Sequence, residues 1–306
     1  MLTFIGRRLM VMLPTLILVS IFVFALQQLL PGDPAEVLAG EERDPQVIEL
    51  IQQKYRLDQP LPVQYAYWLG NILTGDFGVS IRTQLPIAQT ILQKLPITIQ
   101  LALMAMGIAI LIGIPAGIVA AVWRGTRLDH GANVVALSGL SIPNFWLGIM
   151  MILLFSVILG WLPVSGRSGL ASFILPAITL GTSLAALLTR LMRSSLLEVL
   201  NQDYVRTATA KGLQRRLVLL KHAVRNALLS YVTVLGLQVA TLMAGAVVTE
   251  QVFAWPGIGL LAIQAINSRD MPVIQGVVIV AALIVMSANL LVDILYALID
   301  PRISYS

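Results

Sequence analysis

Residues 97–122 read ITIQLALMAMGIAILIGIPAGIVAAV, a run without a single charged side chain. A helix needs about 20 apolar residues to cross a bilayer, so this stretch is long enough to span one. Five further apolar runs of that length lie at about 9–30, 133–158, 174–196, 231–254 and 274–298. The sequence therefore predicts an all-α integral membrane protein with six transmembrane helices.

The composition agrees with lipid as the solvent. The chain is 58% hydrophobic and only 11% charged, whereas soluble proteins are roughly 25% charged. The run at 9–30 is longer than a typical signal core and lacks a small-residue cleavage pattern before Pro31, so we expect it to be retained. The absence of cysteine excludes disulfides and thiolate metal sites.

The basic residues are distributed unevenly between the loops. With six spans, the N-terminus, the second and fourth loops and the C-terminus share one side, and that side holds 13 of the 20 Lys and Arg when Arg190 and Arg193, near the same end of the fourth span, are included. The other side carries seven, together with ten acids. Because cytoplasmic loops are enriched in Lys and Arg, both termini are predicted to be cytoplasmic. This sidedness accounts for the net charge of +5 without a nucleic-acid partner.

The spans divide the chain into two predicted regions. Residues 1–96 hold the first transmembrane helix and a long outer segment, and residues 97–306 form a five-helix core with a cytoplasmic loop at about 197–230. In the outer segment, 44–58 and 61–73 have helical patterns, and the second carries aromatic side chains that suit a membrane–water boundary. We expect a short helical cap at the outer surface; a loosely packed loop is the alternative.

Two spans carry small residues at every fourth position. The first stripe is Gly113, Gly117 and Ala121, and the second is Gly236, Ala240 and Ala244. Such stripes allow helix backbones to approach closely inside lipid. A chance pattern in helices rich in Gly and Ala is the alternative.

The sequence shows no arrangement of residues that is typical of a catalytic site. None of the four lysines follows a glycine, so no Gly-Lys phosphate loop exists, and there is no HExxH motif or paired intramembrane acid. Asp293 lies inside the last span, and we predict that it forms a structural ion pair with Arg190 or Arg193. Glu250, near the outer end of the fifth span, is a candidate for an outer gate or a receptor contact. No catalytic, cofactor-binding or metal-binding residue is predicted.

The fourth loop contains the stretch DYVRTATAKGLQRRLVLLKHAVRNA at 203–227, which holds six of the 20 Lys and Arg. Gly212 divides it into two helical pieces, and Tyr204, Ala208 and Lys211 share one face of the first. The small residues at 207–210 predict a thin helix that inserts into a groove of a partner protein. A basic loop that attracts anionic lipid is the alternative.

The chain resembles the membrane subunits of type I ABC importers of the dipeptide, oligopeptide, nickel and glutathione group. The resemblance covers nearly the whole chain. It is carried by RRLMVMLPTLILVSIFVFALQQLLPGDPA (7–35), LDQPLPVQY (57–65), GDFGVS (75–80), SIPNFWLG (141–148), GWLP (160–163), LPAITLG (175–181), DYVRTATAKG (203–212), HAVRNA (222–227), EQVFAWPGIG (250–259) and NLLVDILYALIDPR (289–302).

The resemblance implies a role for the fourth loop. In this family the loop forms a coupling helix that docks into an ATPase subunit, and the matching positions here are Asp203, Tyr204, Arg206, Thr207, Ala208, Ala210, Lys211 and Gly212. Two positions depart from the pattern: Thr209 stands where arginine is frequent, and Ser230 stands where proline is frequent. The first departure weakens a charge contact with the ATPase, and the second softens the entry into the fifth span.

The resemblance further implies a pore-forming permease of the bacterial cytoplasmic membrane that is not itself an enzyme. Its expected partners are a second, similar permease, two ATPase subunits that use ATP and Mg, an extracytoplasmic binding protein and the lipid bilayer. Short peptides are the expected substrates, with glutathione or a nickel chelate as alternatives. A bare metal ion would find no imidazole ligand in the outer half of the chain. A self-sufficient carrier or channel is the rival class, and it would need an intramembrane ion site that the sequence does not show.

Overall fold

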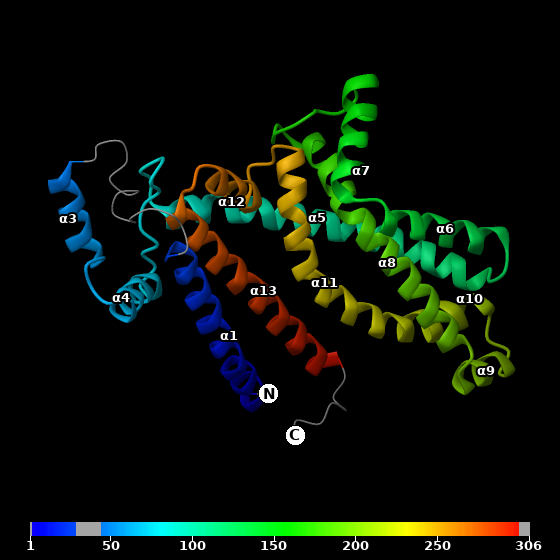
Figure 1. Cartoon of the computed structure of the whole chain (residues 1–306). Helices are drawn as coiled ribbons and strands as arrows, with labels where there is room; N and C mark the ends of the chain where they lie inside the picture. Colours follow the sequence, from blue (N-terminus) through cyan, green and yellow to red (C-terminus); the bar gives the residue numbers. More distant parts are fainter. Residues whose placement is uncertain (1, 29–43, 300–306) are drawn as a thin grey trace. The chain divides into compact units, whose positions relative to one another are not determined.

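The computed structural model describes residues 2–28 and 44–299, and this part of the chain is almost entirely helical (Figure 1). Two π-helical segments, Ile152–Ile158 and Val218–Val224, follow α7 and α10, and a 3-10 turn at Leu170–Phe173 precedes α8. The α-helices are α1 (Leu2–Gln28), α3 (Pro45–Tyr55), α4 (Leu61–Leu73), α5 (Ile87–Val122), α6 (Arg127–Ser141), α7 (Asn144–Met151), α8 (Ile174–Leu200), α9 (Asp203–Ala210), α10 (Arg215–Leu217), α11 (Arg225–Val252), α12 (Ile258–Asn267) and α13 (Met271–Ile299).

Five helical stretches of the described chain are apolar and long enough to cross a membrane. They are Gly6–Leu26, Ile87–Val122, Leu170–Leu200, Val234–Val252 and Met271–Ile294. These stretches correspond to the first, second, fourth, fifth and sixth predicted spans. The third predicted span, 133–158, differs, because it consists of two helices that meet at an angle.

The third span is bent by 102° between Arg127–Ser141 and Asn144–Ile158. The break falls at Ile142, whose backbone is extended (φ −80°, ψ 123°), directly before Pro143. Proline has no N–H to donate and disfavours helical geometry in the residue before it, so the helix stops there and a new one starts at Asn144. The predicted total of six spans holds when this bent pair is taken as one span.

The two helices predicted in the outer segment are confirmed as α3 and α4. Helix α4 packs against α1 through an aromatic cluster. The hydroxyl groups of Ser20 and Tyr65 are 2.7 Å apart and hydrogen-bonded, and the ring of Phe24 lies 5.5 Å from that of Tyr65 and 5.6 Å from that of Trp68. The aromatic residues predicted for a membrane boundary therefore also attach the outer segment to the first transmembrane helix.

The chain forms two compact units. The first contains residues 1–96 and 260–287, and the second contains 97–259 and 288–306. Residues 260–287, which the sequence analysis assigned to the five-helix core, pack with the N-terminal region instead.

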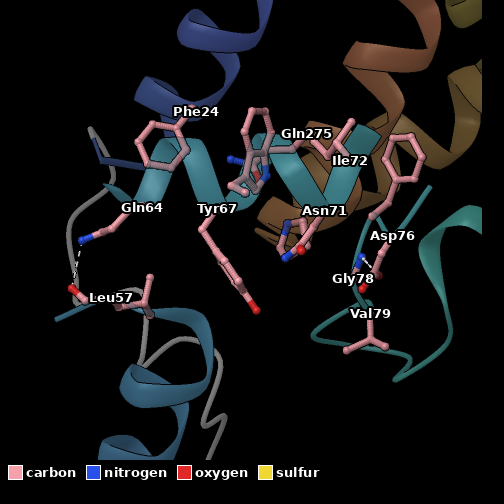
Figure 2. Close-up of a pocket in the computed structure, with 13 residues that line it drawn as sticks. Phe24, Leu57, Gln64, Tyr67, Asn71, Ile72, Asp76, Gly78, Val79 and Gln275 are labelled. Atoms are coloured by element: carbon pink, nitrogen blue, oxygen red, sulfur yellow. Dashed lines mark hydrogen bonds between the residues drawn. The ribbon is translucent and has the colours of Figure 1, made fainter. Parts of the chain in front are cut away.

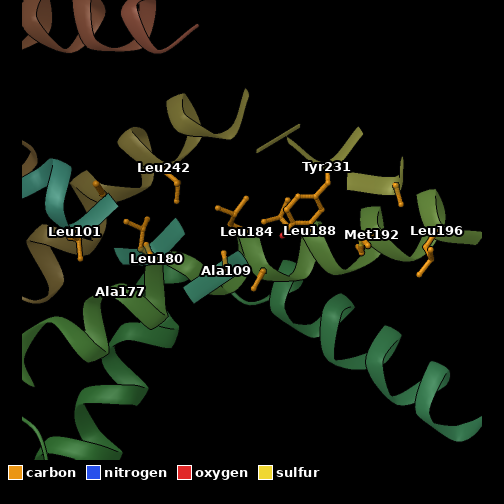
Figure 3. Close-up of a cluster of buried hydrophobic side chains, with 14 of the residues drawn as sticks. Leu101, Ala109, Ala177, Leu180, Leu184, Leu188, Met192, Leu196, Tyr231 and Leu242 are labelled. Carbon is orange, nitrogen blue, oxygen red and sulfur yellow. The ribbon is translucent and has the colours of Figure 1, made fainter. Parts of the chain in front are cut away.

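The core of the second unit is built on one face of α8 (Figure 3). The buried side chains recur at every fourth position, which is the spacing of one helical face: Leu180, Leu184, Leu188, Met192 and Leu196. Helices α6, α7 and α11 contact α8. Because lipid tails are as apolar as these side chains, close packing rather than transfer out of water stabilises such a core.

The first small-residue stripe produces close packing of α5 on α8. A methyl group added at Gly117 would lie 2.5 Å from Cβ of Met192, and one added at Gly113 would lie 2.9 Å from Cβ of Leu188. Both distances are shorter than ordinary contacts between carbon atoms. The predicted close approach is therefore confirmed for this stripe, and α8 is the partner helix.

Candidate functional site

Helix α9 (Asp203–Ala210) forms where the sequence predicts the docking helix, and it ends in a tight turn. The N–H of Gly212 donates to the carbonyl of Thr209 at 3.0 Å, and Gly212 has a φ of 77°. An added Cβ at Gly212 would meet nothing within 4 Å. Glycine is therefore required by the left-handed backbone of the turn and not by a lack of space.

One face of α9 is buried against its own chain. Val205 is 4% exposed and Ala208 is 7% exposed, and both pack against Val218 at the start of the second π-helical segment. The prediction that Ala208 lies on the docking face is wrong. A short helix between two long ones is stabilised mainly by tertiary packing, and its two most apolar positions on one face provide that packing.

The other predicted docking residues are solvent-exposed, namely Asp203, Tyr204, Arg206, Thr207 and Ala210 in α9 and Lys211 directly after it. The hydroxyl of Thr207 donates to the carbonyl of Asp203 at 2.9 Å, so this side chain presents mainly its methyl group. Arg206 lies 3.6 Å from Asp203, and both are exposed, so this pair contributes only about 0–1 kcal/mol. The resulting surface is narrow and positively charged at its rim.

Tyr204 links α9 to the start of α11. The side-chain amide of Asn226 donates to the Tyr204 hydroxyl at 2.9 Å and to the carbonyl of His222 at 2.9 Å. Helix α9 is therefore connected to the start of the fifth span through a hydrogen bond as well as through the backbone.

A second candidate site surrounds Glu250 at the end of α11. Its side chain is completely buried, and the hydroxyl of Thr98 on α5 donates to Oε1 of Glu250 at 2.6 Å. The same Thr98 oxygen accepts a hydrogen bond from the N–H of Ile258 at 2.9 Å. The carboxylate therefore joins α5, α11 and the first residue of α12.

The residues that follow Glu250 in the sequence pack closely around its side chain. An added Cβ at Gly257 would lie 2.1 Å from Oε1 of Glu250 and 2.4 Å from Oγ1 of Thr98. Trp255 is also fully buried, and its ring packs edge-on against that of Phe173, with centroids 4.5 Å apart. Glu250 thus lies inside its unit and not on its surface; its predicted role in a gate or a receptor contact stays a prediction.

The intramembrane arginine Arg193 has a different partner from the one predicted. Its Nε donates to Oδ1 of Asp129 at 2.6 Å, and its Nη2 donates to Oδ2 at 2.8 Å. The sequence analysis did not single out Asp129, although this acid precedes the third span and lies in the first turn of α6. The pairing of Asp293 with Arg193 is therefore replaced, whereas a pairing of Asp293 with Arg190 stays a prediction.

The first unit contains an aromatic pocket of about 310 Å³ (Figure 2). Aromatic and amide side chains line it, including Tyr67, Trp68 and Asn71 from α4 and Gln275 from α13. Gln64 is fixed at its edge, because its amide donates to the carbonyl of Leu57 at 2.9 Å and to that of Gln59 at 2.8 Å. The pocket combines an apolar wall with polar groups, a lining typical of small-molecule sites.

Two known protein families match this chain. The family of binding-protein-dependent transport system inner membrane components matches residues 113–305, and the corresponding N-terminal family matches residues 1–102. The chain belongs to this family. It is thus an ABC importer permease subunit of the inner membrane, with several transmembrane helices.

Curated relatives of this binding-protein-dependent permease extend over its full length. The glutathione transport system permease protein GsiC of Escherichia coli strain K12 is 45% identical over 305 residues, with 100% of both chains covered. GsiC of Shigella dysenteriae serotype 1 strain Sd197 has the same identity and coverage.

Solved structures show that the permease shares its fold with other importers. A chain of the inward-facing MetNI methionine ABC transporter matches with a TM-score of 0.61 and 18% identity, covering 69% of this chain and 97% of that one. A chain of an amino acid ABC transporter with histidines matches with a TM-score of 0.53 and 15% identity, covering 70% and 94%. These likenesses establish the ABC permease fold.

Proposed function

We propose that this permease subunit imports short peptides, glutathione among them, by ATP-driven alternating access. The observation that carries the proposal is the 45% identity, over the whole of both chains, to a glutathione transport permease. The alignment includes the outer segment, the spans and the loop at 203–212. A difference in substrate class would be expected to lower the similarity of the regions that meet the substrate.

The proposed assembly contains a second permease subunit, two ATPase subunits and an extracytoplasmic binding protein. The exposed residues of α9 support the ATPase contact, because they remain accessible to a partner while Val205 and Ala208 are buried within the chain. In this assembly ATP and Mg bind the partner subunits, and this chain binds no cofactor. The family description, which names dependence on a binding protein, supports the receptor.

We further propose that both termini and α9 are cytoplasmic. The support is the excess of Lys and Arg on that side, 13 against seven. In this orientation α9 meets the ATPases, and the outer segment with α3 and α4 meets the receptor. Closure of the ATPases would then move α8 and α11, the two spans that α9 connects.

Reconstitution of the two permeases and two ATPases in proteoliposomes, with the binding protein added, tests the proposal. With ATP inside and loaded receptor outside, we expect uptake of alanyl-alanine and glutathione, with ATP hydrolysis stimulated by the receptor. A nickel–histidine chelate serves as the competing substrate. Uptake of the chelate alone would refute the peptide assignment, and uptake by this chain without ATPases under an ion gradient would establish a self-sufficient carrier.

A further inference from the structure

A polar hollow of about 540 Å³ lies in the first unit, apart from the aromatic pocket. It is bounded by the loop before α5, the first turns of α5, and the segment from α12 to the start of α13. Its lining includes two cations, four hydroxyl groups and two amides, from Arg82, Lys94, Ser80, Thr83, Thr90, Ser268, Gln264 and Asn267. Pockets for small ligands have volumes of about 300–1,000 Å³, so the size suits a small molecule.

The loop that carries Arg82 is held rigid by a buried carboxylate. Asp270 is 4% exposed; it accepts hydrogen bonds from the Ser80 hydroxyl at 2.5 Å, from the N–H of Ile81 at 3.3 Å and from the N–H of Arg82 at 3.4 Å. The N–H of Ser80 also donates to the carbonyl of Leu85 at 3.0 Å. The entropy of ordering the loop is thus lost during folding and not during binding, which favours affinity for a ligand.

The two cations of the hollow have no carboxylate partner within the described residues. Arg82 is exposed and Lys94 is half-buried, and neither forms an ion pair in that part of the chain. Asp270, the acid in the lining, already accepts three hydrogen bonds from the loop. Partial burial of an unpaired ammonium group is unfavourable, and an anion in the hollow would remove this cost.

We infer that this hollow binds the free carboxylate of the transported substrate on the outer side of the membrane. Arg82 and Lys94 supply charge-assisted hydrogen bonds, which are stronger than neutral ones. Leu261 and Val273, also in the lining, offer apolar surface to the rest of the molecule. The inference rests on the proposed function in one respect, since peptides and glutathione carry a free carboxylate and arrive from the side on which these loops are predicted to lie.

Chemical footprinting tests the binding step without transport. In the purified assembly without ATP, acylation of Lys94 by an amine-reactive reagent is followed by mass spectrometry, with Lys221, an exposed lysine outside the docking residues, as internal reference. We expect alanyl-alanine to slow acylation of Lys94 severalfold and its C-terminal amide to leave the rate unchanged. Arg82→Gln should abolish the protection. Equal protection by both compounds, or protection by neither, would overturn the inference.

Uptake measurements test the same site during transport. Lys94→Gln and Arg82→Gln should lower the ratio of free-acid to amide uptake by about tenfold, the loss expected for one charge-assisted hydrogen bond. Lys94→Arg should retain the ratio, and so should Arg56→Gln, which removes an exposed charge from the same unit outside this hollow. The receptor is the same in all these assays, so its own preference for the acid or the amide affects every uptake ratio equally.

Other occupants of the hollow have distinct outcomes, each of which overturns the inference. Equal losses for the acid and the amide would show that the cations contact the receptor protein. A loss that depends on the fraction of anionic phospholipid in the vesicles would show that they bind lipid headgroups. If the wild-type assembly transports neither peptide, the proposed function fails, whereas the Lys94 footprint still decides whether the hollow binds a carboxylate.

Discussion

Arg193 of α8 holds Asp129 of α6 through two parallel hydrogen bonds, 2.6 and 2.8 Å long. The carboxylate accepts two more, from the N–H of Gly125 at 2.9 Å and from the side-chain amide of Asn133 at 2.8 Å. One buried acid therefore fixes the loop between α5 and α6 and attaches both to the central helix of the second unit. The N-terminal end of the bent third span is positioned by this network.

Removal of one member of this pair should destabilise the protein. Arg193→Met leaves the buried Asp129 without its partner, and the free energy of unfolding should fall by about 3 kcal/mol. The double variant Asp129→Leu/Arg193→Met should recover part of the loss, because no charge is left unpaired. Thermal unfolding of purified protein measures both effects. Arg127→Met, at an exposed position at the start of α6, is the control; a loss as large as that of Arg193→Met would contradict this assignment.

The cluster around Glu250 should tolerate no side chain at position 257. In Gly257→Ala the new methyl group would overlap Oε1 of Glu250, and overpacking of this kind costs about 1–3 kcal/mol. Gly131→Ala is the matched control, because an added Cβ there meets nothing within 4 Å and lies on a helix; it should be neutral or stabilising. Melting temperatures decide the comparison, and equal values for the two variants would remove the steric argument.

The two faces of α9 should respond differently to a charged substitution. Ala210→Glu lies on the exposed face, so the subunit should fold normally while receptor-stimulated ATP hydrolysis collapses. Ala208→Glu places a carboxylate against Val205 and Val218 and should lower the yield of folded protein. Arg215→Ala, at an exposed position in α10 and outside α9, should change ATP hydrolysis little. Full stimulation in Ala210→Glu would show that the basic stretch is only a topology signal.

The turn after α9 should be sensitive to backbone strain. Gly212 has a φ of 77°, and a β-branched residue is strongly disfavoured there. Gly212→Val should leave membrane insertion intact and reduce coupling between the ATPases and transport, whereas Gly212→Asn, which tolerates this conformation better, should retain more of it. The ratio of transported substrate to hydrolysed ATP is the measurement. Identical ratios for the two variants would show that the turn geometry is unimportant.

Membrane topology can be read directly from single cysteines in this cysteine-free chain. Gln46 in α3 and Gln214 after α9 are both exposed, so Gln46→Cys and Gln214→Cys should both react with a thiol reagent. In intact cells an impermeant reagent should label only Gln46→Cys. Labelling of both from outside would refute the cytoplasmic location of α9.

Much of the fold follows from local patterns. A run such as 97–122 leaves the backbone no hydrogen-bond partners in lipid except its own, so the apolar runs predict helices at nearly their observed positions. The helix at 203–210 and the turn at Gly212 were also predictable, because small residues, a glycine and flanking charges are local signals. Pro143 was visible in the sequence, but its effect was missed because the apolar run continues through it.

The sequence by itself determined which segments are helical, that they belong in a membrane, and that the loop at 203–212 stands apart from them. Only the tertiary structure decided that Arg193 binds Asp129, that Ala208 faces inward, and that residues 260–287 pack with the N-terminal region. The reason is physical. Helix formation and burial in lipid depend on neighbours within a few residues, whereas the partner of a charge depends on which helices come together across more than 60 positions of the chain.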